Sequence, residues 1–163
     1  MNPSDPCLPD DAASIQSTGY LLWHASRRWR RELAAALAPL ELTYAEWGLL
    51  ASLHFLAPPG AARKPGHGPT QKEVADHAGL DPMVTSEALR ALERRDLVQR
   101  VSSSRDQRAR ALVITQEGAR LALVGVAIVR EIAQRLFANI SDLRAFECAL
   151  NSVIEDSDES ASF

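Results

Sequence analysis

The stretch TQKEVADHAGLDPMVTSEALRALERRDLVQR, residues 70–100, carries the signals that decide the fold. Thr70, with a glutamate three residues later, is a capping box that predicts the start of a short helix, and Gly79 predicts its end. Asp81 before a proline predicts a second helix running to about Arg95, because aspartate caps helices well and proline fits the first turn. Two short helices joined by a glycine-containing turn are typical of a helix-turn-helix.

The residues that follow change to the patterning of strands. LVQRV (97–101) and RALVIT (110–115) flank the polar stretch SSSRDQRA, which predicts a β-hairpin. The hairpin tip carries Arg105, Asp106 and Arg108. An arginine-bearing tip suits the narrow minor groove of DNA, where the negative potential is strong. Because residues two apart point to the same side of a strand, Asp106 can hold the Arg108 guanidinium in one orientation.

Longer helices are predicted on both sides of this region. Apolar residues recur at helical spacing over 14–40, 42–57, 116–140 and 141–154. The predicted fold class is therefore mainly α with a small β-hairpin wing. The expected divisions are a disordered acidic tail (1–13), an N-terminal helix (14–40), a winged helix-turn-helix domain (41–115), two C-terminal helices (116–154) and a second acidic disordered tail (155–163).

The charge of the chain is unevenly distributed. The net charge is −3, from 18 Lys and Arg against 21 Asp and Glu. Seven of the acids, and no base, lie in the two tails, so residues 14–154 hold 18 basic against 14 acidic residues. The body is mildly basic, and the net charge gives no argument against a nucleic-acid partner.

Composition favours a cytoplasmic protein. Cys7 and Cys148 are far apart in sequence and indicate no disulfide framework, which fits a reducing setting. The N-terminus does not read as a signal peptide. The longest apolar run, LALVGVAIV (121–129), is much shorter than the roughly twenty residues that cross a bilayer, so no membrane partner is expected.

A helical wheel of the second short helix separates an inward face from an exposed one. The predicted inward residues are Val84, Thr85, Ala88, Leu89, Ala91 and Leu92. A helix fits the major groove, so the other face supplies candidate DNA contacts: Met83 for a thymine methyl group, Ser86, Glu87, Arg90 and Arg94. Glu87 can accept from a cytosine amino group or pair with Arg90 or Arg94. The alternative is an ordinary solvated face.

Three segments together resemble the MarR family of bacterial transcription regulators. They are LTYAEWGLLASL, residues 70–100 and RDQRARALVITQEG, the last with the wing pattern Asp-x-Arg-x-Arg that ends at Arg110. The resemblance covers about 20–137. It adds Thr70, Gln71 and Arg110 to the candidate DNA contacts and implies that Arg108 is the minor-groove residue.

The resemblance also implies how the protein works. Members are homodimers in which the N-terminal helix and the last two helices interlock, so 14–40 and 116–154 are expected to be dimerisation helices. Two winged domains then bind a pseudo-palindromic operator in double-stranded DNA. Most members are repressors, often released by a small molecule. The all-round apolar character of 121–129 supports a dimer independently, because such a helix is rarely left exposed.

The sequence departs from the family pattern in three places. Many members have Thr-Arg where this chain has Ser86 and Glu87. The base sequence read is therefore expected to differ, with Arg90 taking over a contact. Asp96 stands where members often have glycine, and aspartate tolerates a left-handed conformation. The loop 57–69 is longer than usual and rich in proline.

A ligand site is expected on the first two long helices. Trp23, Tyr44, Trp47 and His54 lie where the family's ligand cleft would lie, although an aromatic stripe is more often core. No catalytic motif or metal-ligand spacing is present, so neither an enzyme nor a required cofactor is expected.

Two other functions remain open at this stage. One is a thiol-based redox-responsive regulator that uses Cys7, or Cys148 in the last helix, where we expect Cys148 to be packed. The other is a winged-helix protein-interaction module without a specific DNA site. The basic, non-apolar wing tip favours DNA over a protein partner.

Overall fold

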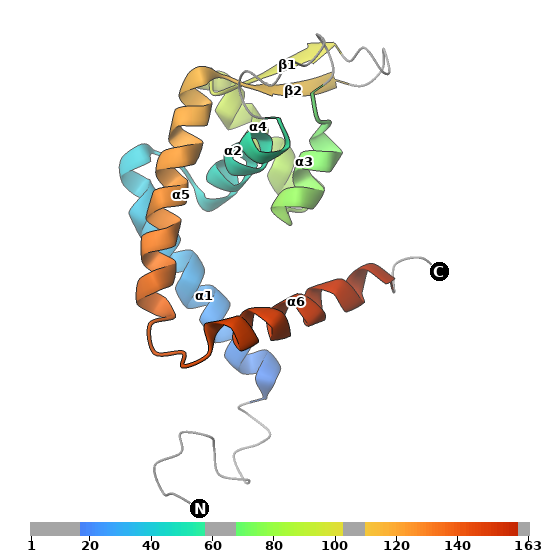
Figure 1. The fold of residues 1–163 in the computed structure, drawn as a ribbon. Coiled ribbons are helices and arrows are strands. Elements are labelled where there is room, and N and C mark those ends of the chain that lie inside the picture. Colours follow the sequence, from blue (N-terminus) through green and yellow to red (C-terminus); the bar gives the residue numbers. More distant parts are fainter. Residues whose placement is uncertain (1–16, 58–67, 103–109, 160–163) are drawn as a thin grey trace, which may run out of the picture. The chain divides into compact units, whose positions relative to one another are not determined.

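The computed structural model describes residues 17–57, 68–102 and 110–159. Here the chain is mainly helical with one antiparallel hairpin, which confirms the predicted fold class (Figure 1). No helix in these ranges combines the length and apolar character that crossing a membrane needs. The chain divides into two compact units within α5, after Ile128. The elements are α1 (Thr18–Leu37), the 3-10 turn η1 (Ala38–Leu40), α2 (Tyr44–Leu56), α3 (Gln71–Ala78), α4 (Pro82–Arg94), β1 (Val98–Ser102), β2 (Arg110–Ile114), α5 (Gln116–Leu136) and α6 (Leu143–Glu159).

Helix α2 lies at the centre of the first unit, where it contacts α1, α3, α4 and β2. The predicted capping box forms at its start. The Thr43 amide donates to the Glu46 carboxylate at 2.7 Å, and the Glu46 amide donates to the Thr43 hydroxyl at 3.2 Å. Leu49, Leu50 and Leu53 are fully buried along the helix. Burying one leucine contributes about 2 kcal/mol, so α2 is the main hydrophobic support of the helix-turn-helix.

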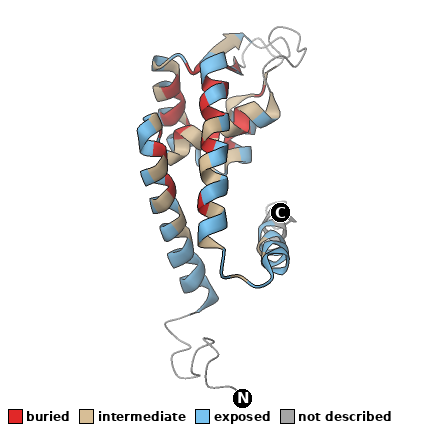
Figure 2. Cartoon of the chain, turned by 60° about the vertical axis from the view of Figure 1, so that its left-hand side comes forward, coloured by how far each residue is buried: buried red, intermediate tan, exposed pale blue. Residues whose placement is uncertain are grey.

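Helix α1 is buried only near its C-terminal end. Leu33 and Leu37 are fully buried, whereas Leu21 and Leu22 are 50% and 48% exposed. Figure 2 shows the same change along the helix, from exposed first turns to buried positions near its end. The helix stops before Pro39, as predicted, and its predicted first residues lie outside the described ranges.

Helices α3 and α4 form the helix-turn-helix at the residues that the sequence predicts. Thr70 caps α3 through reciprocal bonds with the glutamate three residues on, and Gly79 ends the helix with a φ of 63°. The Asp81 carboxylate caps α4 by accepting from the amides of Met83 at 2.9 Å and Val84 at 3.0 Å. Figure 1 shows both helices grouped with α2 beneath the hairpin, so local capping signals set the position of the whole motif.

The hairpin of β1 and β2 packs against both of these helices. Its register places Ser102 opposite Arg110 at the end nearest the tip. On the α3 side, the Leu112 amide donates to the Pro69 carbonyl at 2.8 Å. Both strands were predicted to within one residue at each end.

A tight turn joins α4 to β1. Asp96 has a φ of 53°, in the left-handed region, as expected where the family often has glycine. The amide of the buried Leu97 donates to the Leu92 carbonyl at 2.9 Å. The Leu97 carbonyl accepts from the Thr115 amide at 3.1 Å and from the Thr115 hydroxyl at 3.2 Å. The turn therefore holds the ends of α4 and β2 together.

The predicted inward face of α4 is wrong at its first residue. Val84 is 37% exposed, and Ala91 is only partly buried. The helical wheel assumes that the core covers the whole helix, but the first turn extends past the residues that pack against it. The buried residues of α4 are Thr85, Ala88, Leu89 and Leu92.

Helix α6, in the second unit, differs from the prediction at both ends. It begins at Leu143 rather than Ser141, because the Asp142 carboxylate accepts from the amide three residues on at 2.9 Å. It continues to Glu159, so the expected disorder is wrong for 155–159. Glutamate has a high helix propensity, and an acidic composition alone does not end a helix.

The side chain of Cys148 is exposed, contrary to the prediction that it is packed. None of the described side chains of α6 is buried, and Leu143, Val153 and Ile154 are exposed as well. The prediction assumed that the last helix packs within one chain, and the single chain leaves it uncovered.

The close approach of α5 to the turn after α4 generates a testable prediction. A β-carbon at Gly118 would lie 2.2 Å from the Leu97 carbonyl oxygen, a backbone atom that cannot easily move. We expect Gly118→Ala to lower the free energy of unfolding by about 1–3 kcal/mol, measured by urea denaturation. Gly48→Ala is the control, because a β-carbon there has no neighbour within 4 Å. It should be neutral or stabilising by up to about 1 kcal/mol, and equal losses in both variants would contradict the packing described.

Candidate nucleic-acid interface

Helix α4 presents a polar face to solvent. Met83 is 74% exposed, and Glu87, Arg90 and Arg94 are exposed as well. Ser86 is partly buried beside them. The structure therefore brings all five candidate residues of this helix onto its accessible surface, where a bound duplex could meet them.

The charges of this face are not neutralised by one another. Among the ion pairs of the described residues, none involves Glu87, so the predicted alternative of a pair with Arg90 or Arg94 is not formed. One acid therefore remains available to accept a hydrogen bond from a base, next to two arginines that attract phosphate.

The opposite face of α4 fixes its orientation. Leu89 and Leu92 are fully buried in the core that α2 and the hairpin share. Thr85 is fully buried too, and its hydroxyl has no hydrogen-bond partner among the described residues. An unpartnered buried hydroxyl costs about 1–3 kcal/mol, so α4 carries a polar penalty that its leucines offset.

Thr70 and Gln71 lie at the start of α3. The Thr70 hydroxyl donates to the Glu73 carboxylate at 2.9 Å and accepts from the Glu73 amide at 3.2 Å. That hydroxyl is committed to capping, which leaves the partly buried Gln71 as the freer of the two side chains.

The wing tip lies outside the described residues. This applies to Arg105, Asp106 and Arg108, whose predicted roles remain predictions. Arg110 begins β2 opposite Ser102, so the candidate tip residues connect the ends of two paired strands.

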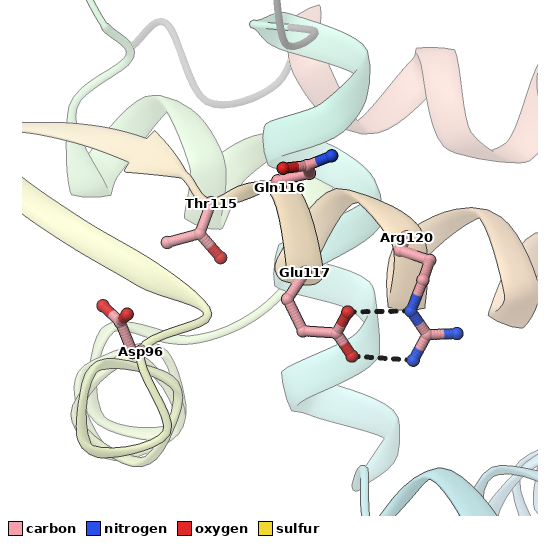
Figure 3. A pocket seen from close by; sticks show the side chains of 5 residues that line it. All are labelled: Asp96, Thr115, Gln116, Glu117 and Arg120. Carbon is pink, nitrogen blue, oxygen red and sulfur yellow. Dashed lines mark hydrogen bonds and ion pairs between the residues drawn. The ribbon is translucent and has the colours of Figure 1, made fainter.

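A shallow hollow lies at the base of the wing, beside the start of α5 (Figure 3). It has a volume of about 440 Å³ and is lined by Asp96, Thr115, Gln116, Glu117 and Arg120. Arg120 donates to both oxygens of the Glu117 carboxylate, at 2.8 and 2.7 Å, and this hydrogen bonding lowers the pKa of Glu117. Because the only cation lining the hollow is already paired, the hollow is not suited to an anion.

The four candidate ligand residues are not gathered at one point. Tyr44 and Trp47 have ring centroids 6.5 Å apart. The Trp47 indole donates to the Ala122 carbonyl at 3.3 Å, which makes it a packing contact between α2 and α5. Trp23 contacts His24 and Arg27 of its own helix. The Nδ1 atom of His54 is buried and has no partner among the described residues.

Two arginines near the end of α4 make contacts that sequence reasoning missed. Arg95 donates to the carbonyls of Leu40 and Glu41, at the end of η1. Arg100, on β1, pairs with Glu93 of α4 at 2.8 Å. The Arg95 contacts join residues more than fifty positions apart, so no local pattern could have shown them. The Glu93–Arg100 spacing of seven becomes meaningful only once the turn between α4 and β1 is known.

The described elements define a winged helix-turn-helix protein. A capped pair of helices is followed directly by a hairpin that packs on both of them. A family model described as the MarR family matches residues 66–109, which contain this pair and most of the hairpin.

Curated relatives extend the match over most of the chain. The HTH-type transcriptional regulator YdcH of Bacillus subtilis is 30% identical over 141 residues, which cover 85% of this chain and 90% of that protein. The HTH-type transcriptional repressor Rv2887 of Mycobacterium tuberculosis is 33% identical over 134 residues, which cover 82% and 86%. The chain therefore belongs to the MarR family, and it is a DNA-binding transcription regulator.

Solved structures agree. The crystal structure of Rv2887 in complex with salicylic acid matches with a TM-score of 0.64 and 31% identity, over 86% of this chain and 98% of that one. A mutant of MarR from E. coli, complexed with operator DNA, matches with a TM-score of 0.73 and 22% identity, over 89% and 99%. At that identity the second match shows the shared fold.

The cap of α4 generates a prediction about the interface. Asp81→Ala removes the acceptor for the first two free amides of α4 and should cost about 1 kcal/mol. Because the loss is local, we expect faster hydrogen exchange at the amides of Met83 and Val84 and weaker DNA binding. Asp81→Asn should retain most of the cap and most of the binding. Unchanged exchange in Asp81→Ala would contradict the role of this carboxylate.

Proposed function

We propose that the chain is a homodimeric, sequence-specific repressor that a small-molecule ligand releases from its operator. The observation that carries the proposal is the accessible polar face of α4, held outward by a buried apolar face. The relative Rv2887 is named a repressor, and its crystal structure contains salicylic acid. Both names support a ligand-released repressor for this chain.

In this proposal α4 reads base edges and the wing supplies affinity. Ser86 and Arg90 are polar readers of the major groove, Met83 contacts a thymine methyl group, and Glu87 accepts from a cytosine amino group. Arg108 enters the minor groove and Asp106 orients it. Residues that contact phosphate position the protein without reading sequence, and the proposed ones are Thr70, Gln71, Arg94, Arg105 and Arg110.

The proposed dimer would use the helices at the two ends of the chain, over 14–40 and 116–154. Large apolar side chains are exposed on all three of these helices. Examples are Leu22 on α1 at 48%, Leu123 on α5 at 53% and Ile154 on α6 at 63%. Contiguous apolar surface of this kind marks interaction sites, and burial in a second copy would remove it from water.

A ligand is proposed to bind near α1 and α2, with Trp23, Tyr44, Trp47 and His54 as candidate contacts. The unpartnered Nδ1 atom of His54 supports this site, because a buried ring nitrogen without a partner can take one from a ligand. Aromatic rings beside a few polar groups suit an aromatic acid or a similar small molecule.

The proposal assigns the chain a binding function and no catalytic one. Its operation is an exchange between DNA and ligand, which requires no cofactor. We place it in the cytoplasm, because its proposed partner is DNA.

The proposal is tested by fluorescence anisotropy of the purified chain on its own upstream DNA over a salt series. We expect saturable binding of two chains per duplex, with a log–log salt slope of about −0.9 per neutralised phosphate. Arg108→Ala should weaken binding about tenfold or more, and Arg120→Ala, an equal loss of charge within a helix, should not.

Two results would contradict the proposal. One is binding no tighter than to random DNA. The other is equal weakening by both substitutions, which would reduce the role of the wing to general electrostatic attraction.

A further inference from the structure

The direction of the wing relative to α4 depends on contacts at the base of the hairpin. Only residues 95–97 separate the end of α4 from β1. The backbone bonds of Leu97 hold the two chain ends together there. A hairpin held only at this point keeps freedom to rock about its base, so contacts farther along the strands are needed to fix its direction.

One rung of the hairpin has such contacts on both sides. Arg100 of β1 lies opposite Leu112 of β2. The Leu112 amide donates to the Pro69 carbonyl, just before α3, at 2.8 Å. The Arg100 Nε atom donates to the carboxylate of Glu93, in the last turn of α4, at 2.8 Å. The same rung therefore joins the wing to both helices of the helix-turn-helix.

The pair of Glu93 and Arg100 is shielded from solvent. The side chains of Arg100 and Glu93 are 25% and 29% exposed. Those of Arg120 and Glu117, which pair within α5, are 58% and 54% exposed. Partial burial reduces screening by salt, and a guanidinium donating to a carboxylate forms one of the stronger hydrogen bonds in proteins.

We propose that Glu93 and Arg100 are positioning residues that fix the direction of the wing relative to α4. They thereby set the distance along DNA between the base pairs that α4 reads and the minor groove that the wing reaches. This inference rests on the proposed function. Neither side chain needs to touch DNA in this role, and each acts only through the other.

Charge-neutral variants separate this role from simple electrostatics. Glu93→Gln removes an acid near the DNA, so electrostatics alone predicts tighter binding. Loss of the brace predicts the opposite. We expect Glu93→Gln and Arg100→Gln each to weaken binding to the operator by about tenfold, with little change in binding to random DNA. The matched controls are Glu117→Gln and Arg120→Gln, which make the same charge changes in a pair that joins no two elements and should leave the operator preference intact.

A charge swap tests the pairing directly. Glu93→Arg combined with Arg100→Glu keeps the net charge and can restore the ion pair. We expect the double variant to recover most of the operator affinity that the two single reversals lose. Hydroxyl-radical cleavage of the flanking minor groove should be suppressed by the unmodified chain and by the double variant, and not by the single reversals. Thermal unfolding of every variant shows whether a loss of affinity reflects unfolding.

Three results would overturn the inference. In the first, Glu93→Gln binds the operator as tightly as the unmodified chain or more tightly while Arg100→Gln binds weakly, which would make Arg100 a phosphate contact. In the second, the swap recovers nothing although it folds. In the third, operator and random DNA lose affinity equally. Failure of the unmodified chain to prefer any operator is a different result, because it removes the proposed function before the brace is tested.

Discussion

The backbone of Leu97 connects three parts of the DNA-binding unit. Its amide donates to the end of α4, and its carbonyl accepts two hydrogen bonds from Thr115, between β2 and α5. The same carbonyl oxygen faces Gly118, where α5 passes too close for any β-carbon. Because the side chain is also buried, a shift of the recognition helix cannot occur there without disturbing the wing or α5. The geometry of the interface depends on this one residue being held from all sides.

Around this point, apolar and charged contacts have different tasks. The leucines of α2 and α4 determine where the recognition helix lies, and their burial carries most of the stability. Ion pairs such as Glu93–Arg100 contribute less energy and act by direction, since a guanidinium fork accepts few orientations. The arginines of the outer face of α4 remain unpaired in the described chain and available for DNA. An acidic protein can thus present a basic reading surface, because its excess acids lie near the two ends of the sequence.

The sequence predicts those features that depend on neighbours a few residues away. The caps at Thr70 and Asp81 and both strands could be found in this way, because capping and alternation are local. Val84 and Cys148 were predicted wrongly, because their burial depends on how far a neighbouring element extends or on whether a second chain covers the helix. The contacts of Arg95 could not be predicted at all, since its acceptors lie on η1, far away in the sequence. Of the candidate interface, the face of α4 was therefore predictable and the bracing of the wing was not.

The central claim is that α4 reads the major groove while the wing reaches the adjacent minor groove. The most direct measurement is dimethyl sulfate footprinting on the DNA upstream of the gene, because this reagent reports guanine N7 in the major groove and adenine N3 in the minor groove. The account predicts guanine protection in two half-sites about one helical turn apart, with adenine protection immediately outside each. Guanine protection with unchanged flanking adenines, or no discrete footprint at saturating protein, would contradict it.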